Sequence, residues 1–103
     1  MDKEILFDVV TPLNVRVRTT KEYWDYIVNI KHPSMKNKED IVKETLLNPE
    51  EICKSKIDQN VYLYYRQFDR IYCIVVKHRG QEGFLITTYP TDKIKEGERT
   101  WKK

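Results

Sequence analysis

The sequence is poor in the residues and segments that mark several common classes of protein. It has two cysteines in 103 residues, which is too few for a disulfide framework. Its three glycines and four prolines exclude a collagen-like or linker-like composition. It has no apolar run of about 18 residues and no signal-peptide core. The sequence therefore predicts a reduced, cytoplasmic protein that has no contact with membranes.

Motifs for metal binding and nucleophilic catalysis are absent as well. Cys53 and Cys73 stand 20 positions apart, which is not the close pair of a zinc site. The two histidines, His32 and His78, lie elsewhere, and His78 is expected in a loop. There is no glycine-rich phosphate loop and no nucleophilic serine or cysteine motif. We therefore expect no metal and no cofactor.

The residues that are present suit a small folded domain. Forty per cent are hydrophobic and 34% are charged, with seven tyrosines among them. The net charge of +3 is unevenly distributed, because residues 61–103 hold nine lysines and arginines against five acidic residues. This balance is compatible with an anionic partner such as RNA, although surface lysines that only keep a domain soluble explain it more readily.

The N-terminal half predicts two short strands and then a helix. The β-prone runs Ile5–Val10 and Val15–Arg18 flank a proline turn and favour short strands. A capping box formed by Thr19 and Glu22 predicts the start of the helix, and Pro33 ends it because proline has no backbone N–H.

The next segments predict a second helix and a charged tail. The helix is expected from about Lys38 to Leu47, with Asn37 as its cap, and a short strand follows at Ile52–Ser55. The tail is expected to wrap over the surface, with Trp101 as its anchor.

The stretch from Val61 to Tyr89 has the pattern of a three-stranded antiparallel meander. The predicted fold is α+β, with two N-terminal helices packed on one face of a mainly antiparallel four- to five-stranded sheet. We expect a single domain over residues 1–103. Its parts are the N-terminal strands (1–18), a helical half (19–50), the antiparallel sheet (51–90) and the charged tail (91–103).

Alternation within the meander predicts that one sheet face is polar and left uncovered by the helices. This face is expected to hold five side chains: Tyr62, Tyr64, Arg66, Thr87 and Tyr89. The central run from Ile71 to Lys77 is apolar on both sides, so the face that it buries is not determined.

Such a face has the groups that metal-free cleavage of RNA needs. His32 is the candidate base or acid, because imidazole changes charge nearest to neutral pH. Arg66 is expected to hold the phosphate, and Thr87 and Tyr89 to donate hydrogen bonds or position the scissile group. The expected substrate-binding residues are Tyr62 and Tyr64, which would stack on bases, and Lys54, Lys77, Arg16 and Arg18, which would meet phosphates.

Each of these residues also has a structural explanation. A histidine before Pro33 is a common polar end of a helix, tyrosine-rich strands usually pack, and threonine is a good strand residue. Arg16 and Arg18 alternate with valines and suit the wet side of an edge strand.

Four short segments carry a resemblance to a known family. They are Trp24…Ile27…Ile30-Lys31-His32-Pro33; Leu46-Leu47-Asn48-Pro49-Glu50-Glu51-Ile52; Val61-Tyr62-Leu63-Tyr64-Tyr65-Arg66; and Gly83-Phe84-Leu85-Ile86-Thr87-Thr88-Tyr89. Over roughly residues 13 to 97 the chain resembles the phage-associated PBECR-type domains, a branch of the barnase, EndoU, colicin and RelE superfamily of small ribonuclease toxins.

The resemblance implies N-terminal helices packed on a four-stranded antiparallel sheet. It implies a site made by His32, Arg66, Thr87 and Tyr89. Related toxins often have several basic residues at the site, whereas this chain offers one histidine and one strand arginine.

The leading hypothesis is therefore a toxin-like, metal-independent endoribonuclease with RNA as substrate, held in check by an antitoxin or immunity-type protein. One alternative is a non-catalytic module that binds RNA or protein on the same fold. Another is a phage accessory protein that has no affinity for nucleic acid. The sequence does not predict the oligomeric state.

Overall fold

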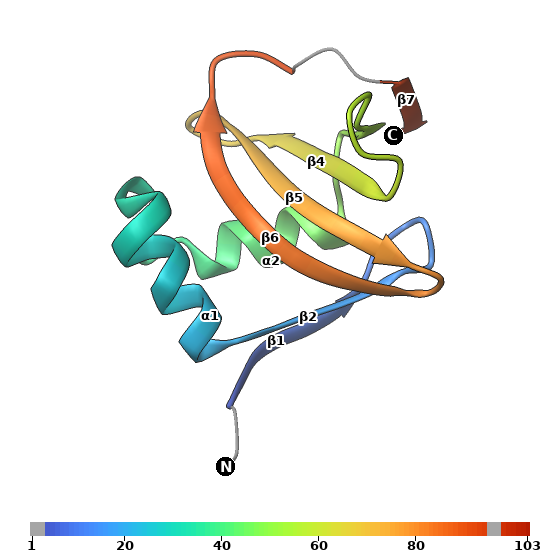
Figure 1. Cartoon of the computed structure of the whole chain (residues 1–103). Helices are drawn as coiled ribbons and strands as arrows, with labels where there is room; N and C mark the ends of the chain where they lie inside the picture. The colour runs from blue at the N-terminus through green and yellow to red at the C-terminus, as the bar shows by residue number, and fades with distance from the viewer. Residues whose placement is uncertain (1–3, 95–97) are drawn as a thin grey trace.

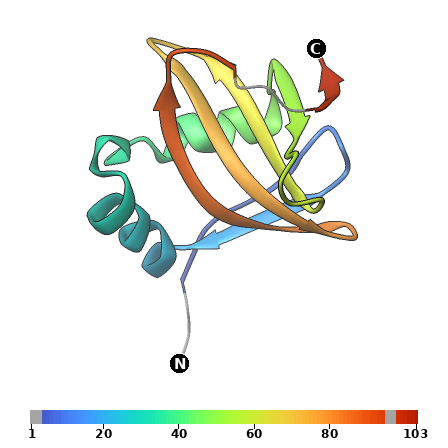
Figure 2. The same ribbon diagram turned by 45° about the horizontal axis from the view of Figure 1, so that its top comes forward.

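The computed structural model describes residues 4–94 and 98–103, in which seven strands form one mixed sheet (Figures 1 and 2). The strands are β1 (Ile5–Val10), β2 (Arg16–Thr20), β3 (Glu51–Lys54), β4 (Val61–Gln67), β5 (Ile71–Arg79), β6 (Glu82–Thr91) and β7 (Glu98–Lys102). The helices are α1 (Lys21–Tyr26) and α2 (Glu39–Leu47), joined by a π-helical turn, η1 (Ile27–Lys31), and a 3₁₀ turn, η2 (Pro33–Met35). The order across the sheet is β1-β2-β6-β5-β4-β3-β7.

The α+β class is right, but the predicted arrangement is wrong. The sheet has seven strands in place of the expected four or five, and the two helices that pack on it are short. The β1–β2 hairpin extends the sheet because Arg16–Arg18 pair in parallel with Glu82–Phe84. The tail extends the other edge as β7, which pairs with β3. These long-range pairings leave no local signal in the sequence.

The predicted first helix is present, with its cap one residue later than expected. The Thr20 hydroxyl, and not that of Thr19, accepts a hydrogen bond from the backbone N–H of Tyr23 at 3.1 Å. The helix widens into η1 and ends before Pro33, as the proline predicts. Residue 32 therefore stands at the end of the helical segment.

The cap makes a measurable contribution to stability. Thr20→Ala is expected to lower the free energy of unfolding by about 1 kcal/mol, because the Tyr23 N–H loses its acceptor at the start of a short helix. Urea unfolding curves measure the change. Thr20→Ser keeps the acceptor and should stay close to the wild type; an equal loss in both variants would contradict the capping role.

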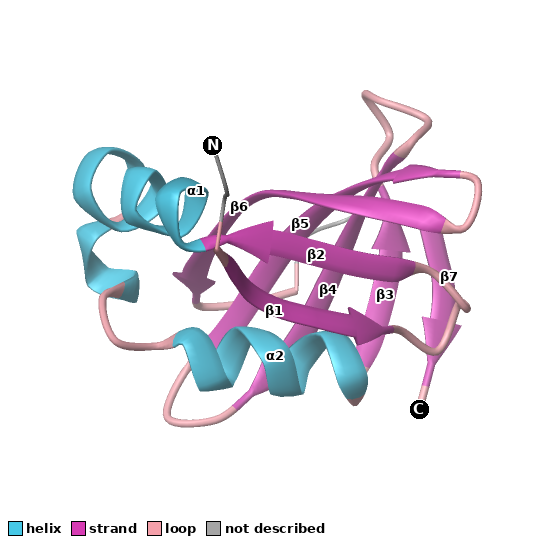
Figure 3. Cartoon of the chain, turned by 90° about the horizontal axis from the view of Figure 1, so that it is seen from below, coloured by secondary structure: helices cyan, strands magenta, loops and turns pink. Residues whose placement is uncertain are grey.

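The inner face of the sheet, defined here as the face that packs on α2, holds the main core. Tyr64, Ile74 and Thr88 lie directly opposite one another on β4, β5 and β6, and all three are fully buried. Val42 and Leu46 of α2 join the same cluster. Figure 3 shows α2 lying along one side of the strands, with α1 at the end of β2.

The outer face carries a second, smaller cluster. The next row along the same strands, Tyr65, Cys73 and Tyr89, points away from α2. Tyr65, Cys73 and Cys53 are buried there, and Leu63 packs against them. Both cysteines are buried thiols that are not in a disulfide, as expected. Because both faces of β4 bury aromatic rings, alternation does not distinguish them.

A β-bulge in β6 shifts the alternation of that strand. Thr87 pairs with Val75 and Leu85 with Val76, so Ile86 has no partner on β5. Leu85 therefore faces inward, while Thr87 points to the outer face. The Ile86 carbonyl accepts a hydrogen bond from the Tyr23 hydroxyl at 2.7 Å, which fixes α1 beside this strand.

The tail is anchored as predicted, although it forms a strand. Trp101 is half-buried, packs against the main core and pairs with Ile52 of β3. Residues 95–97 of the expected charged tail lie outside the described residues.

Candidate functional site

The predicted polar face is wrong, because its residues lie on both sides of the sheet. Tyr62, Tyr64 and Arg66 share the inner face with α2, whereas Thr87 and Tyr89 are on the outer face. Arg66 is opposite Tyr72 in the ladder. It directly follows Tyr65 in β4, so its side chain points to the inner face and away from the outer row. The expected four-residue site therefore loses its arginine.

Arg66 stabilises the end of α2. Its guanidinium donates a hydrogen bond to the Asn48 carbonyl at 2.8 Å and lies 3.5 Å from the Glu44 carboxylate. It also lies 5.1 Å from the centre of the Phe68 ring. A cation at a helix C-terminus meets carbonyls that have no partner within the helix. This local role explains why Arg66 is on the inner face.

Tyr64 is part of the interior and is not a platform for bases, and Tyr62 is half-buried beside it on the inner face. Tyr64 has no exposed surface, and its hydroxyl contacts Thr11 Oγ1 and His78 Nε2, each at 3.0 Å. The Tyr62 ring stacks on the His78 ring with centroids 3.9 Å apart. His78 belongs to β5, so its predicted loop position is wrong.

Burial changes the titration of this inner group. Desolvation raises the pKa of Tyr64 to about 12 and lowers that of His78 to about 4. His78 is therefore neutral at pH 7 and is held between two rings. This histidine is a structural residue.

The other histidine lies at the outer face. His32 is half-buried at the end of η1, and its ring centroid is 5.5 Å from that of Tyr89. Its backbone N–H donates to the Ile27 carbonyl, which holds the residue in place after the helix ends. Thr87 and Tyr89 lie on this face of β6, so three of the four predicted catalytic residues are brought together.

The two hydroxyl-bearing side chains of this group are partly shielded from solvent on the outer face. Burial, together with the neighbouring Cys73 thiol, raises the pKa of Tyr89 far above its usual range, so the phenol stays neutral. The Thr87 hydroxyl oxygen is buried and has no hydrogen-bond partner among residues 4–94 and 98–103. The Tyr89 ring thus supports His32, while the hydroxyl of the half-buried Thr87 is not exposed to solvent.

Two residues next to this group were missed in the sequence. Lys31 extends its ammonium to within 3.5 Å of the Ile86 carbonyl, and it lies 5.7 Å from the Tyr26 ring centre. The Tyr23 hydroxyl shares the same carbonyl. Lys31 directly precedes His32, and this adjacency was the available signal.

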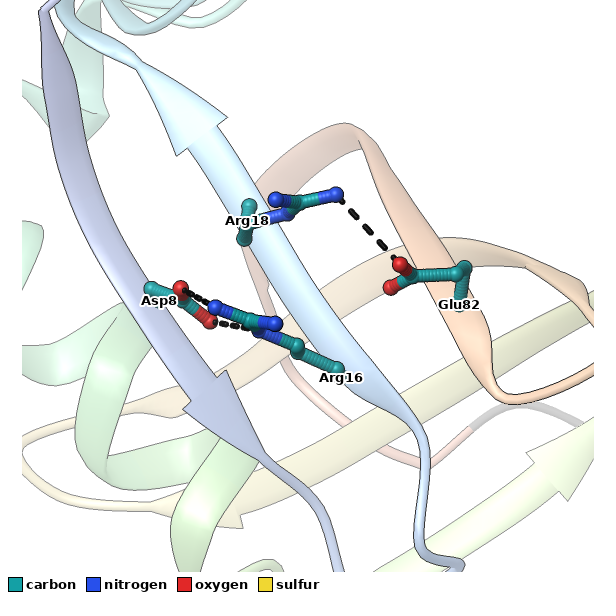
Figure 4. A network of polar contacts seen from close by, with 4 residues as sticks. All are labelled: Asp8, Arg16, Arg18 and Glu82. Atoms are coloured by element: carbon teal, nitrogen blue, oxygen red, sulfur yellow. Dashed lines mark hydrogen bonds and ion pairs between the residues drawn. The ribbon is translucent and has the colours of Figure 1, made fainter.

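The predicted phosphate contacts are separated by the fold. Lys54 is half-buried on β3, where it is paired with Tyr62 on the inner face. Arg16 is held by the Asp8 carboxylate through two hydrogen bonds, one of 2.8 Å from Nε (Figure 4). Arg18 and Lys77 line one hollow at the outer face.

No metal site is evident in the described part of the chain, where no three histidine, cysteine or acidic side chains converge. The helices in the described ranges are too short or too polar to span a bilayer. Comparison with protein-family models, curated proteins and solved structures finds no match to this chain.

Proposed function

We propose that the protein is a metal-independent endoribonuclease in which His32 transfers protons. The observation that carries the proposal is the position of His32 against the outer face of β6, beside Lys31 and supported by the Tyr89 ring. The resemblance of its short segments to ribonuclease toxins also supports it. Arg66 has no part in this proposal, since it lies on the other face.

The reaction is transesterification at phosphorus. His32 takes the proton of the ribose 2′-hydroxyl, the 2′-oxygen bonds to phosphorus, the bond from phosphorus to the 5′-oxygen breaks, and His32 gives its proton to that oxygen. The products are a 2′,3′-cyclic phosphate and a 5′-hydroxyl. His32, whose imidazole can both accept and donate a proton, is the outer-face side chain that we assign to these transfers. The Lys31 ammonium offsets the charge that develops on the phosphorane.

This function places the protein in the cytoplasm, where RNA is available and thiols remain reduced, and it calls for an inhibitory partner to protect the host cell. The two buried thiols, which are not in a disulfide, agree with a reducing compartment. Burial raises the pKa of Cys53 to about 11, so its thiol is unreactive.

The test uses single-stranded RNA in excess EDTA. Wild-type protein is expected to release products that carry a 2′,3′-cyclic phosphate, and His32→Ala is expected to slow cleavage by about 100-fold or more, because proton transfer by a positioned side chain contributes that much. Gel analysis of end-labelled RNA gives the rate.

His78→Phe is the matched control, because it removes the chain's other histidine from the inner face. It should cleave at a rate close to that of the wild type. Absence of cleavage by the wild type, or cleavage by His32→Ala at the wild-type rate, would reject the proposal. Salt-sensitive binding without cleavage would favour the non-catalytic RNA-binding alternative.

A further inference from the structure

Three side chains form a row across the outer face near the start of β6. Arg18 of β2 is opposite Phe84 of β6 in the parallel ladder, and Phe84 is opposite Lys77 of β5 in the antiparallel ladder. Opposed residues point to the same side, with β-carbons about 5 Å apart. Phe84 is 50% exposed, which is unusual for a large apolar side chain. The row is therefore an exposed aromatic ring between two cations.

The row borders a hollow that the fold creates. β2 pairs with β6 over three residues and then turns into α1, so the two strands separate beyond Arg18. The opening has a volume of about 430 Å³, within the range of small-molecule sites. Its lining includes Arg18, Thr20, Tyr23, Lys77, Phe84 and Ile86.

The two cations of the row are available to an anion. Arg18 has one ion pair, with Glu82 at 3.4 Å, and about half of each side chain is exposed. No carboxylate in residues 4–94 and 98–103 forms an ion pair with Lys77. Arg16, on the same strand as Arg18, is instead held by Asp8 in a two-point contact (Figure 4). An exposed pair such as Arg18 and Glu82 contributes little, so a phosphate competes easily for Arg18.

We propose that this hollow binds single-stranded nucleic acid, with one base on the Phe84 ring and the backbone phosphates on either side of that base held by Arg18 and Lys77. Aromatic rings that stack on bases and cations that follow the backbone are the usual means of binding single strands. A duplex keeps its bases stacked inside, so its bases are not available to Phe84.

The inference rests on the proposed ribonuclease function and specifies its substrate. Phe84 and Tyr89 both face outward on β6, roughly 15 Å apart along the strand. The hollow and His32 therefore lie along one track, and the substrate is an oligonucleotide that reaches from one to the other.

The test measures binding separately from cleavage. A labelled single-stranded DNA oligonucleotide has no 2′-hydroxyl, so it cannot be cleaved by transesterification. Fluorescence anisotropy should show salt-dependent binding, and Phe84→Ala should weaken it about tenfold through lost stacking. Arg18→Ala and Lys77→Ala should each weaken it and lower the salt slope by about one.

Arg16→Ala is the matched control for Arg18→Ala, because the two arginines lie on the same face of β2 and are similarly exposed. It should change affinity by less than about twofold, since Asp8 already holds its charge. Equal effects of the two arginine variants, or duplex DNA bound as tightly as the single strand, would overturn the inference.

The outcomes separate the two proposals. Binding of single-stranded DNA through Phe84 and Arg18 with no cleavage of RNA would leave the binding site standing and reject the enzyme. Cleavage of RNA that does not change in Phe84→Ala, Arg18→Ala or Lys77→Ala would support the enzyme and reject the binding site.

Discussion

Gly83→Ala is expected to destabilise the protein by about 3 kcal/mol, at the upper end of the effect of overpacking. A β-carbon at Gly83 would lie 2.9 Å from Val15 Cγ1 and 3.0 Å from methyl groups of Val17 and Val76. All three valines are buried, and branching at their β-carbons restricts their rotation. Urea unfolding should show a lower midpoint, and the melting temperature should fall by roughly 10 to 20 °C.

The control position is Gly80, where glycine suits the backbone conformation and where space for a side chain is available. Its φ is +62°, and no atom lies within 4 Å of a β-carbon built there. Gly80→Asn should therefore cost much less, since asparagine tolerates this conformation. Adding Val17→Ala to Gly83→Ala should restore part of the loss, because the two positions are in contact. A Gly83→Ala protein as stable as the wild type would contradict the parallel pairing of β2 with β6.

Acid is expected to weaken the fold through His78. Burial lowers its pKa from 6.5 to about 4, so between these values the unfolded chain binds a proton that the folded chain does not. Stability is therefore intact above about pH 6.5 and falls as the pH drops towards about 4. The full difference corresponds to about 3 kcal/mol. Because His78 is only half-buried and solvent screens part of this cost, we expect about 1 to 2 kcal/mol.

The measurement compares unfolding curves at about pH 7 and about pH 4.5 for the wild type and for His78→Phe. Phenylalanine keeps the ring against Tyr62, and the Tyr64 hydroxyl keeps its bond to Thr11, but the titrating group is removed. The wild type should lose about 1 to 2 kcal/mol more than the variant on acidification. Equal losses would show that other groups, such as carboxylates, cause the acid sensitivity.

Local elements were predictable because their signals are local. The run Ile5–Val10 is β1 as predicted, and the meander over Val61–Tyr89 forms β4, β5 and β6. Pro33 ends the first helical segment, and the second predicted helix is α2 within one residue. Each signal lies within a few residues of the element that it defines.

The arrangement of the sheet was not predictable from such signals. The parallel contact of β2 with β6 joins residues more than 60 positions apart and depends on Gly83 having no side chain. Nothing in the Arg16–Arg18 alternation identifies its partner strand. The strand that the tail forms, β7, was not predicted because the tail is rich in charged residues.

The candidate site was predicted only in part, because local sequence patterns did not show which face of the sheet each side chain occupies. Tyrosine suits both a buried and an exposed position, so Tyr62 and Tyr65 gave no indication of which face is inner. The bulge at Ile86 placed Leu85 and Thr87 on opposite faces, although strict alternation puts them together. Arg66 was assigned to phosphate because its guanidinium suits either an anion or the carbonyls at a helix end.

The bulge also affects which positions of β6 tolerate substitution. The Tyr23 hydroxyl binds the main-chain carbonyl of Ile86, an atom that every amino acid provides. This hydrogen bond therefore does not depend on the identity of residue 86, but it does require the hydroxyl of Tyr23. His32 stands at the far end of the same helical segment. A mutation that removes the Tyr23 hydroxyl would therefore change the position of the His32 imidazole, although His32 itself is unchanged.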